Sequence, residues 1–113
     1  MRTLTPLALA QAQTQPTVPD CLALIEVVQE DLLVIFDGAT DTKPYTSLSS
    51  KLDEASDKLI EGKPVDAVQK LVDFQTTVMA LSTAPKLKLS LEEAALLLND
   101  SQAAINCIEA LGP

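Results

Sequence analysis

The residues best suited to acid–base chemistry in this sequence are acidic, and they occur in close pairs. Glu30 and Asp31 are adjacent, as are Glu92 and Glu93, and Glu26 lies four positions before Glu30. Adjacent residues point about 100° apart on a helix, whereas residues four apart share a face. General acid–base catalysis needs carboxyls that are positioned against one substrate. A solvated helix surface explains these pairs better, so we predict no catalytic residue and no enzymatic activity.

Residues that the sequence lacks exclude several other chemistries. The chain of 113 residues contains no histidine, which excludes Ser-His-Asp and Cys-His nucleophilic sites and histidine-based zinc or haem sites. Its three glycines stand apart at the ends of predicted helices, so no glycine-rich phosphate loop is formed. Segment 37–41 is acidic but lacks the alternating ligands and distal glutamate of a calcium loop. We therefore expect no metal, no cofactor and no small-molecule ligand.

The charge balance narrows the class of partner. Sixteen Asp and Glu residues against eight Lys and Arg residues give a net charge of −8. A surface this negative repels nucleic acid and anionic lipid headgroups and favours neutral or basic protein partners. No apolar run approaches the length of about 18 residues that a membrane span needs. We predict a protein partner or larger assembly, no nucleic acid, and no membrane-spanning segment.

Composition and apolar spacing predict an all-α fold. Hydrophobic residues make up 47% of the chain and aromatic residues only 3%, a composition that suits aliphatic packing between helices. Apolar residues recur at helical spacing in four segments, 20–37, 46–61, 64–82 and 90–111. In the last segment Leu91, Ala94, Leu98, Ile105 and Ile108 are expected to form the buried face. Ser90 and Glu93 match a capping box at its start.

The connections between the four segments are short, which predicts an up-down-up-down antiparallel four-helix bundle. Cys21 lies in the first turn of the first helix and Cys107 in the last turn of the fourth, so this topology brings the two cysteines to the same pole. We predict a disulfide between them, which requires an oxidising compartment. The alternative is two unpaired buried cysteines that behave as small apolar residues.

Residues 1–19 are predicted to be a leader remnant or an extended N-terminal arm that precedes the bundle domain of residues 20–113. The stretch opens with Met1-Arg2, continues with mostly apolar residues, and contains the small-x-small pattern of signal peptidase sites at 8–10. This pattern favours export to an extracellular, periplasmic or lumenal location. A Pro/Gln-rich tail is the alternative.

The first helix is apolar over an unusually wide stripe, and such a helix is central or covered by a partner. We expect a partner or a second copy to cover its side with Val27 and Val34. Tyr45, the only tyrosine, follows Pro44 and is another candidate for partner contact. The alternative for Tyr45 is that its ring caps the end of the bundle from a loop.

The apolar pattern of the chain resembles the FIMAH-type helical domain of bacterial secreted proteins. The resemblance covers about ninety residues and rests on the opening segment 20–26 together with Leu48-x-x-Lys51-Leu52-x-x-Ala55, Leu59-x-x-Gly62, Ala67-Val68-x-x-Leu71-x-x-Phe74-x-x-x-Val78, Glu92-Glu93-Ala94-x-x-Leu97 and Ala104-Ile105-x-x-Ile108. It implies a compact, non-enzymatic module of larger extracellular proteins and assigns no binding residues. The pair of cysteines departs from the family pattern.

Three functions follow from these observations. The first is a non-catalytic exported module for protein–protein interaction or structural support. The alternative is an extrinsic subunit on the lumenal or periplasmic side of a large membrane complex, since the exported bundle with an N-terminal arm is loosely similar to the PsbQ-like lumenal four-helix bundles. An enzyme or metal carrier is the third, and a buried cluster of facing carboxylates, or bound metal in native mass spectrometry, would favour it.

Overall fold

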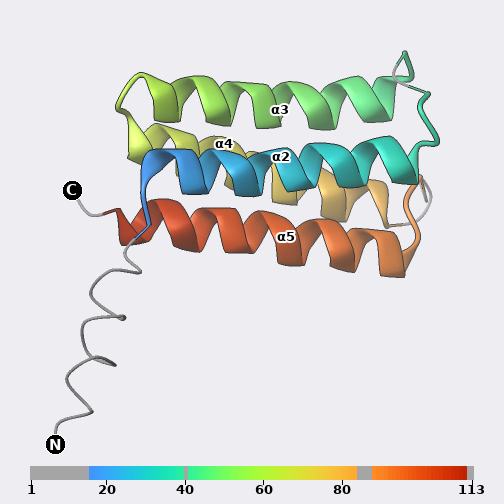
Figure 1. Ribbon diagram of the computed structural model, residues 1–113. Helices are drawn as coiled ribbons and strands as arrows, with labels where there is room; N and C mark the ends of the chain where they lie inside the picture. The colour runs from blue at the N-terminus through green and yellow to red at the C-terminus, as the bar shows by residue number, and fades with distance from the viewer. Residues whose placement is uncertain (1–15, 40, 84–87, 112–113) are drawn as a thin grey trace, which may run out of the picture.

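The protein is a four-helix bundle (Figure 1). The computed structural model describes residues 16–39, 41–83 and 88–111 and contains no strand within them. Its helices are α2 (Val18–Ile35), α3 (Lys43–Ile60), α4 (Pro64–Leu81) and α5 (Leu91–Ala110). Each helix packs on the next one in the chain, and α5 packs back on α2. The predicted up-down-up-down bundle is confirmed, while the predicted arm lies largely outside the described residues.

One stripe of each helix is buried in a common core, because apolar residues recur every three or four positions and the helical turn brings them to one side. The buried residues are Cys21, Ile25, Val28 and Leu32 of α2, Leu48, Leu52, Ala55 and Leu59 of α3, Ala67, Leu71, Phe74 and Val78 of α4, and Ala94, Leu97, Ser101, Ala104, Ile105 and Ile108 of α5. The expectation for Leu91 was wrong, because this first residue of α5 is exposed.

Two helices begin earlier than the sequence pattern predicts. α2 begins at Val18 rather than Asp20, and α3 begins at Lys43 rather than at residue 46. In both cases a proline lies in the first turn, where its missing N–H has no intrahelical acceptor to satisfy and its fixed φ suits the helix. A proline that looks like part of the preceding loop therefore belongs to the helix.

The first and second helices end in the same hydrogen-bonding motif. After α3, the N–H of Gly62 donates to Leu59 and the N–H of Lys63 donates to Lys58, with φ of Gly62 at +82°. After α2, the N–H of Asp37 donates to Val34 and that of Gly38 to Leu33. This hydrogen-bonding motif ends the helix, and the chain then turns back along the bundle.

The N-terminus of α5 carries the predicted capping box, in which the Glu93 N–H donates to Ser90 Oγ and the Ser90 N–H donates to Glu93 Oε1, each at 3.0 Å. Ser90→Ala leaves the Glu93 N–H without its acceptor and is expected to lower the free energy of unfolding by about 1 kcal/mol. Urea unfolding followed by circular dichroism measures the change. Ser50→Ala on the exposed face of α3 is the control and should cost nothing; equal losses would contradict the capping role.

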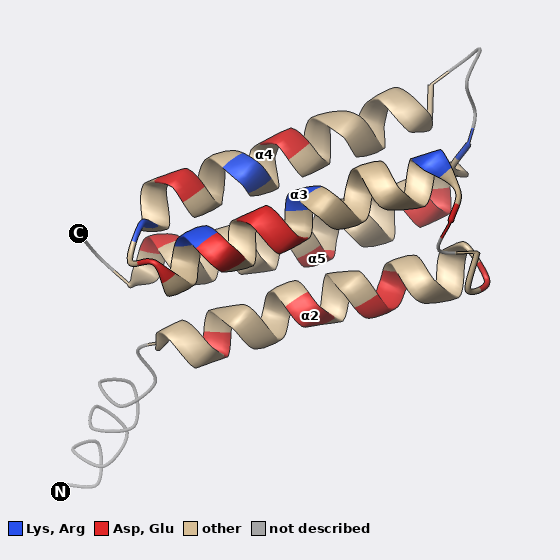
Figure 2. Ribbon diagram, turned by 90° about the horizontal axis from the view of Figure 1, so that it is seen from above, with Lys and Arg blue, Asp and Glu red and all other residues tan. Residues whose placement is uncertain are grey.

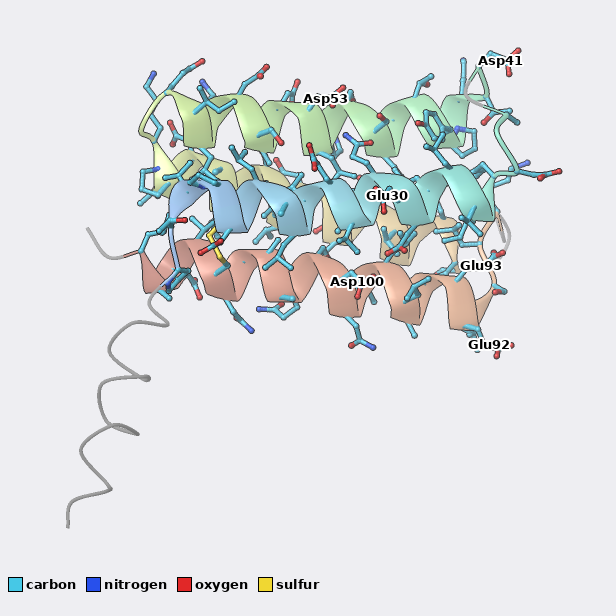
Figure 3. The ribbon with its side chains drawn as sticks, viewed as in Figure 1. Glu30, Asp41, Asp53, Glu92, Glu93 and Asp100 are labelled. Carbon is cyan, nitrogen blue, oxygen red and sulfur yellow. A yellow bond between two sulfur atoms is a disulfide. The ribbon has the colours of Figure 1, made fainter. Side chains whose placement is uncertain are left out.

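The predicted disulfide between Cys21 and Cys107 is present (Figure 3). The two Cα atoms lie 5.5 Å apart although 86 positions separate the residues in sequence. Cys21 lies in the first turn of α2 and Cys107 in the last turn of α5, so the bond closes the contact between the first and last helices at one pole. This covalent link fixes how α2 and α5 sit side by side.

Candidate functional site

Half of the sixteen acidic residues lie on two neighbouring helices that contain no basic residue. Neither α2 nor α5 contains a Lys or Arg, whereas both contain carboxylates: Asp20, Glu26, Glu30 and Asp31 on α2, and Glu92, Glu93, Asp100 and Glu109 on α5. These eight carboxylates account for the net charge of −8, because the other eight acidic residues are balanced by eight basic ones. Figure 2 shows basic segments on α3 and α4 and only acidic ones on α2. The face made by α2 and α5 is therefore strongly negative.

Complementary polar groups join the other pairs of neighbouring helices. Between α2 and α3, Gln29 Nε2 donates to Asp53 Oδ1 at 2.8 Å, and Ser49 Oγ donates to Gln29 Oε1 at 3.1 Å. Between α4 and α5, Gln75 Nε2 donates to the buried Ser101 Oγ at 3.1 Å. These bonds satisfy side chains that helix packing takes partly out of water.

The contact between α3 and α4 carries an ion pair of opposite charges. Lys70 Nζ lies 3.6 Å from Glu54 Oε1, with both side chains partly exposed. Such a pair contributes little stability in water, but its two charges oppose each other across the contact. Three of the four helix contacts are thus electrostatically complementary.

The contact between α2 and α5 instead places two carboxyls, Asp31 and Asp100, against each other. Asp31 Oδ2 is shielded from solvent and has no hydrogen-bond partner among the described residues, although the side chain as a whole is partly exposed. Burial, the hydrogen-bonding proximity and charge of Asp100, and the charge of Glu30 together raise the pKa of Asp31 to about 7. Figure 3 labels Asp100 midway along α5, and on α2 it labels Glu30, which directly precedes Asp31 in the sequence.

The carboxyl pair was missed in the sequence because its members lie far apart in the chain and the obvious acidic pairs are neighbours. The positions of the two cysteines in the sequence nevertheless indicate this carboxyl pair. Ten residues after Cys21 comes Asp31, and in an antiparallel contact the same distance back from Cys107 leads to within one turn of Asp100. With the cysteine pairing accepted, the two carboxyls could have been placed near each other.

Exposed apolar side chains flank the carboxyl pair on both helices. On α2, Val27, Asp31 and Val34 follow the spacing of one helical stripe, and the two valines are 41% and 80% exposed. On α5, Leu96, Asp100 and Ala103 follow the same spacing, and Leu96 is 44% exposed. We call these six residues the α2–α5 face. The coverage of Val27 and Val34 by a partner stays a prediction.

Tyr45 lies in the first turn of α3, not in the loop that the sequence suggested. Its ring is half-buried and packs edge-to-face against Phe36 at the end of α2, with centroids 6.0 Å apart. The side chain therefore closes one end of the bundle from a helix, which corrects the predicted loop position. A partner contact at Tyr45 stays a prediction.

The carboxyl pair can share a proton, as facing carboxyls do elsewhere, but it lies in a helix contact and not in a pocket. A surface depression of about 580 Å³ is lined by Lys43, Pro44, Ser47, Leu81 and Lys88, and neither carboxyl reaches it. Within the described ranges, no three potential metal ligands come together. The absence of enzymatic activity stays a prediction.

No helix in the described part of the chain is long and apolar enough to cross a membrane. No family model, curated protein or solved structure matches the chain. The resemblances to FIMAH-type domains and to PsbQ-like bundles therefore stay predictions.

Proposed function

We propose that the protein is a non-catalytic, exported helical-bundle module that acts by binding another protein through α2 and α5. The observation that carries this proposal is the coincidence of exposed apolar surface with uncompensated charge. Of the ten large apolar side chains that are exposed among the described residues, six lie on α2 and α5. A single exposed apolar residue needs no explanation, but three of these six, Val27, Val34 and Leu96, flank the carboxyl pair, and apolar surface beside charges that no basic residue of α2 or α5 opposes is typical of a contact surface.

The disulfide supports the exported location. Disulfides persist in oxidising compartments and are rare where thiols are kept reduced. This one uses both cysteines of the chain and leaves no free thiol. An exported module of this size gains from such a link, because a domain of about one hundred residues has a small margin of stability.

Site-specific crosslinking tests the binding surface. A photoreactive phenylalanine analogue replaces Val34 on α2 or, as a matched control, Val65 on α4; both valines are 80% exposed. After irradiation in extracts of the native source, we expect a protein adduct of defined mass from position 34 and none from position 65. The same adducts from both positions, or no adduct from either, would contradict binding through α2 and α5.

A further inference from the structure

The α2–α5 face has an acidic centre between two apolar ends. Val27 and Val34 lie about 10 Å apart along α2, because seven residues rise by that length. Leu96 and Ala103 are spaced equally along α5, and the two carboxyls, Asp31 and Asp100, come between these ends. The disulfide fixes the two helices side by side. A partner therefore meets a preformed surface and orders few side chains on binding.

The electrostatics of this face specify the charge of the partner. Asp31 and Asp100 repel each other when both are ionised, and Asp31 Oδ2 lacks any donor among the described residues. No Lys or Arg of α2 or α5 compensates them. A guanidinium or ammonium group placed over the pair would oppose both charges at once and donate to the carboxylate oxygens that face solvent, since both side chains are partly exposed.

The geometry of the face specifies the shape of the partner. Side chains on a helix recur one turn apart, so a helix laid along α2 and α5 contacts both apolar ends with residues one turn before and one turn after its cation. A second copy of this chain would bring its own α2–α5 face, with the same carboxyls and no cation. Anionic lipid is repelled for the same reason.

We propose, on the basis of the proposed function, that the α2–α5 face binds a basic amphipathic helix of another protein, with an Arg or Lys of that helix over Asp31 and Asp100. Apolar residues on either side of the cation pack against Val27 and Val34 of α2 and against Leu96 and Ala103 of α5. The carboxyl pair selects the cation, and the apolar ends contribute the contact area.

Three blocked helical peptides provide the probe. All carry leucines one turn before and one turn after a central position, which holds arginine, glutamine or glutamate. Titration calorimetry with the intact, disulfide-bonded protein measures their affinities. We expect the arginine peptide to bind about tenfold more tightly than the glutamine peptide, a typical effect of a charge-assisted contact, and the glutamate peptide to bind more weakly still.

Matched variants separate the site from the overall charge. Asp31→Asn/Asp100→Asn should abolish the preference for arginine, whereas Asp57→Asn/Asp66→Asn removes two exposed charges from α3 and α4 and should leave that preference intact. Val34→Asn should weaken binding of all the peptides, while Val65→Asn, at equal exposure on α4, should not. Circular dichroism verifies that each variant is folded.

Several results would overturn this inference. These are equal affinity for the arginine and glutamine peptides, equal effects of the two double-aspartate variants, no binding of any peptide, or a dimer in light scattering that Val34→Asn dissociates. None of these results contradicts the proposed function. A crosslinked adduct at position 34 shows that a protein binds there, whether or not the bound segment is a helix and whether or not it carries a cation. Failure of the crosslinking alone would refute a native partner at this face while the peptide preference still held.

Discussion

Removing the disulfide is expected to lower the free energy of unfolding by about 4–5 kcal/mol in the chain-entropy model. The bond closes a loop whose ends are 86 positions apart, so the unfolded chain loses much of its freedom when the two sulfurs are joined. A single domain of this size typically has only about 5–15 kcal/mol of stability. The loss therefore removes a large share of the total.

Cys21→Ala/Cys107→Ala is the appropriate variant, because Cys21 is fully buried and alanine introduces no unsatisfied hydroxyl there. Urea unfolding followed by circular dichroism compares the variant with the wild type, each with and without a thiol reductant. We expect the reductant to shift the wild-type midpoint towards that of the variant and to leave the variant unchanged. Coincident midpoints for the oxidised wild type and the variant would show that the bond contributes no stability.

The second large effect concerns the pH dependence of stability. The folded-state pKa of Asp31, about 7, lies above its ordinary value of 3.8. Between these two values the folded state holds a proton that the unfolded state releases, so stability falls as pH rises. The contribution of Asp31 is fully present below the unfolded pKa and is lost as pH rises through about 7.

Asp31→Asn keeps a donor facing Asp100 at every pH, so it should remove this part of the pH dependence. At about pH 8 we expect the variant to be more stable than the wild type by about 1–2 kcal/mol, a modest value because the side chain is partly exposed and water screens its charge. Near pH 4 the two proteins should be nearly equal. Urea unfolding measured across this range gives the difference directly.

Two further variants test whether the effect arises from the pair. Asp100→Asn removes the opposing charge and offers an amide donor to Asp31, so it should also flatten the pH dependence of stability. Asp57→Asn removes an exposed carboxylate from α3 and should leave that dependence unchanged. A constant stability difference between Asp31→Asn and wild type from about pH 4 to pH 8 would contradict the assignment.

Both effects concern the contact between α2 and α5, which is also the face proposed to bind a basic helix. The disulfide holds this contact closed, and the carboxyl pair opposes it once Asp31 is ionised. Because the disulfide holds α2 and α5 together, their contact can retain an unfavourable pair of like charges. The same pair favours the binding of a cationic partner. Stability and recognition are thus linked through the same two helices.

The sequence by itself determined the helices, most of their ends and the disulfide pairing. Apolar spacing, the capping box at Ser90 and the glycines after α2 and α3 act within a few residues, so one stretch of chain contains the whole signal. The short connections between helices then predicted an up-down-up-down bundle, and this topology places Cys21 beside Cys107. The starts of α2 and α3 were misplaced because proline is compatible both with a loop and with a first helical turn.

The cysteine pairing places Asp31 and Asp100 within one turn of each other along the two helices, but only the tertiary structure decided that their side chains face each other and that Tyr45 packs on Phe36. A periodic apolar pattern shows which stripe of a helix is buried. It does not show which neighbouring helix each side of that stripe contacts, or how far two helices are shifted along each other. Those choices depend on how the side chains of all four helices interlock in one core, and no local pattern contains that information. The facing carboxyls are the result, because they belong to the packing of two helices at opposite ends of the chain.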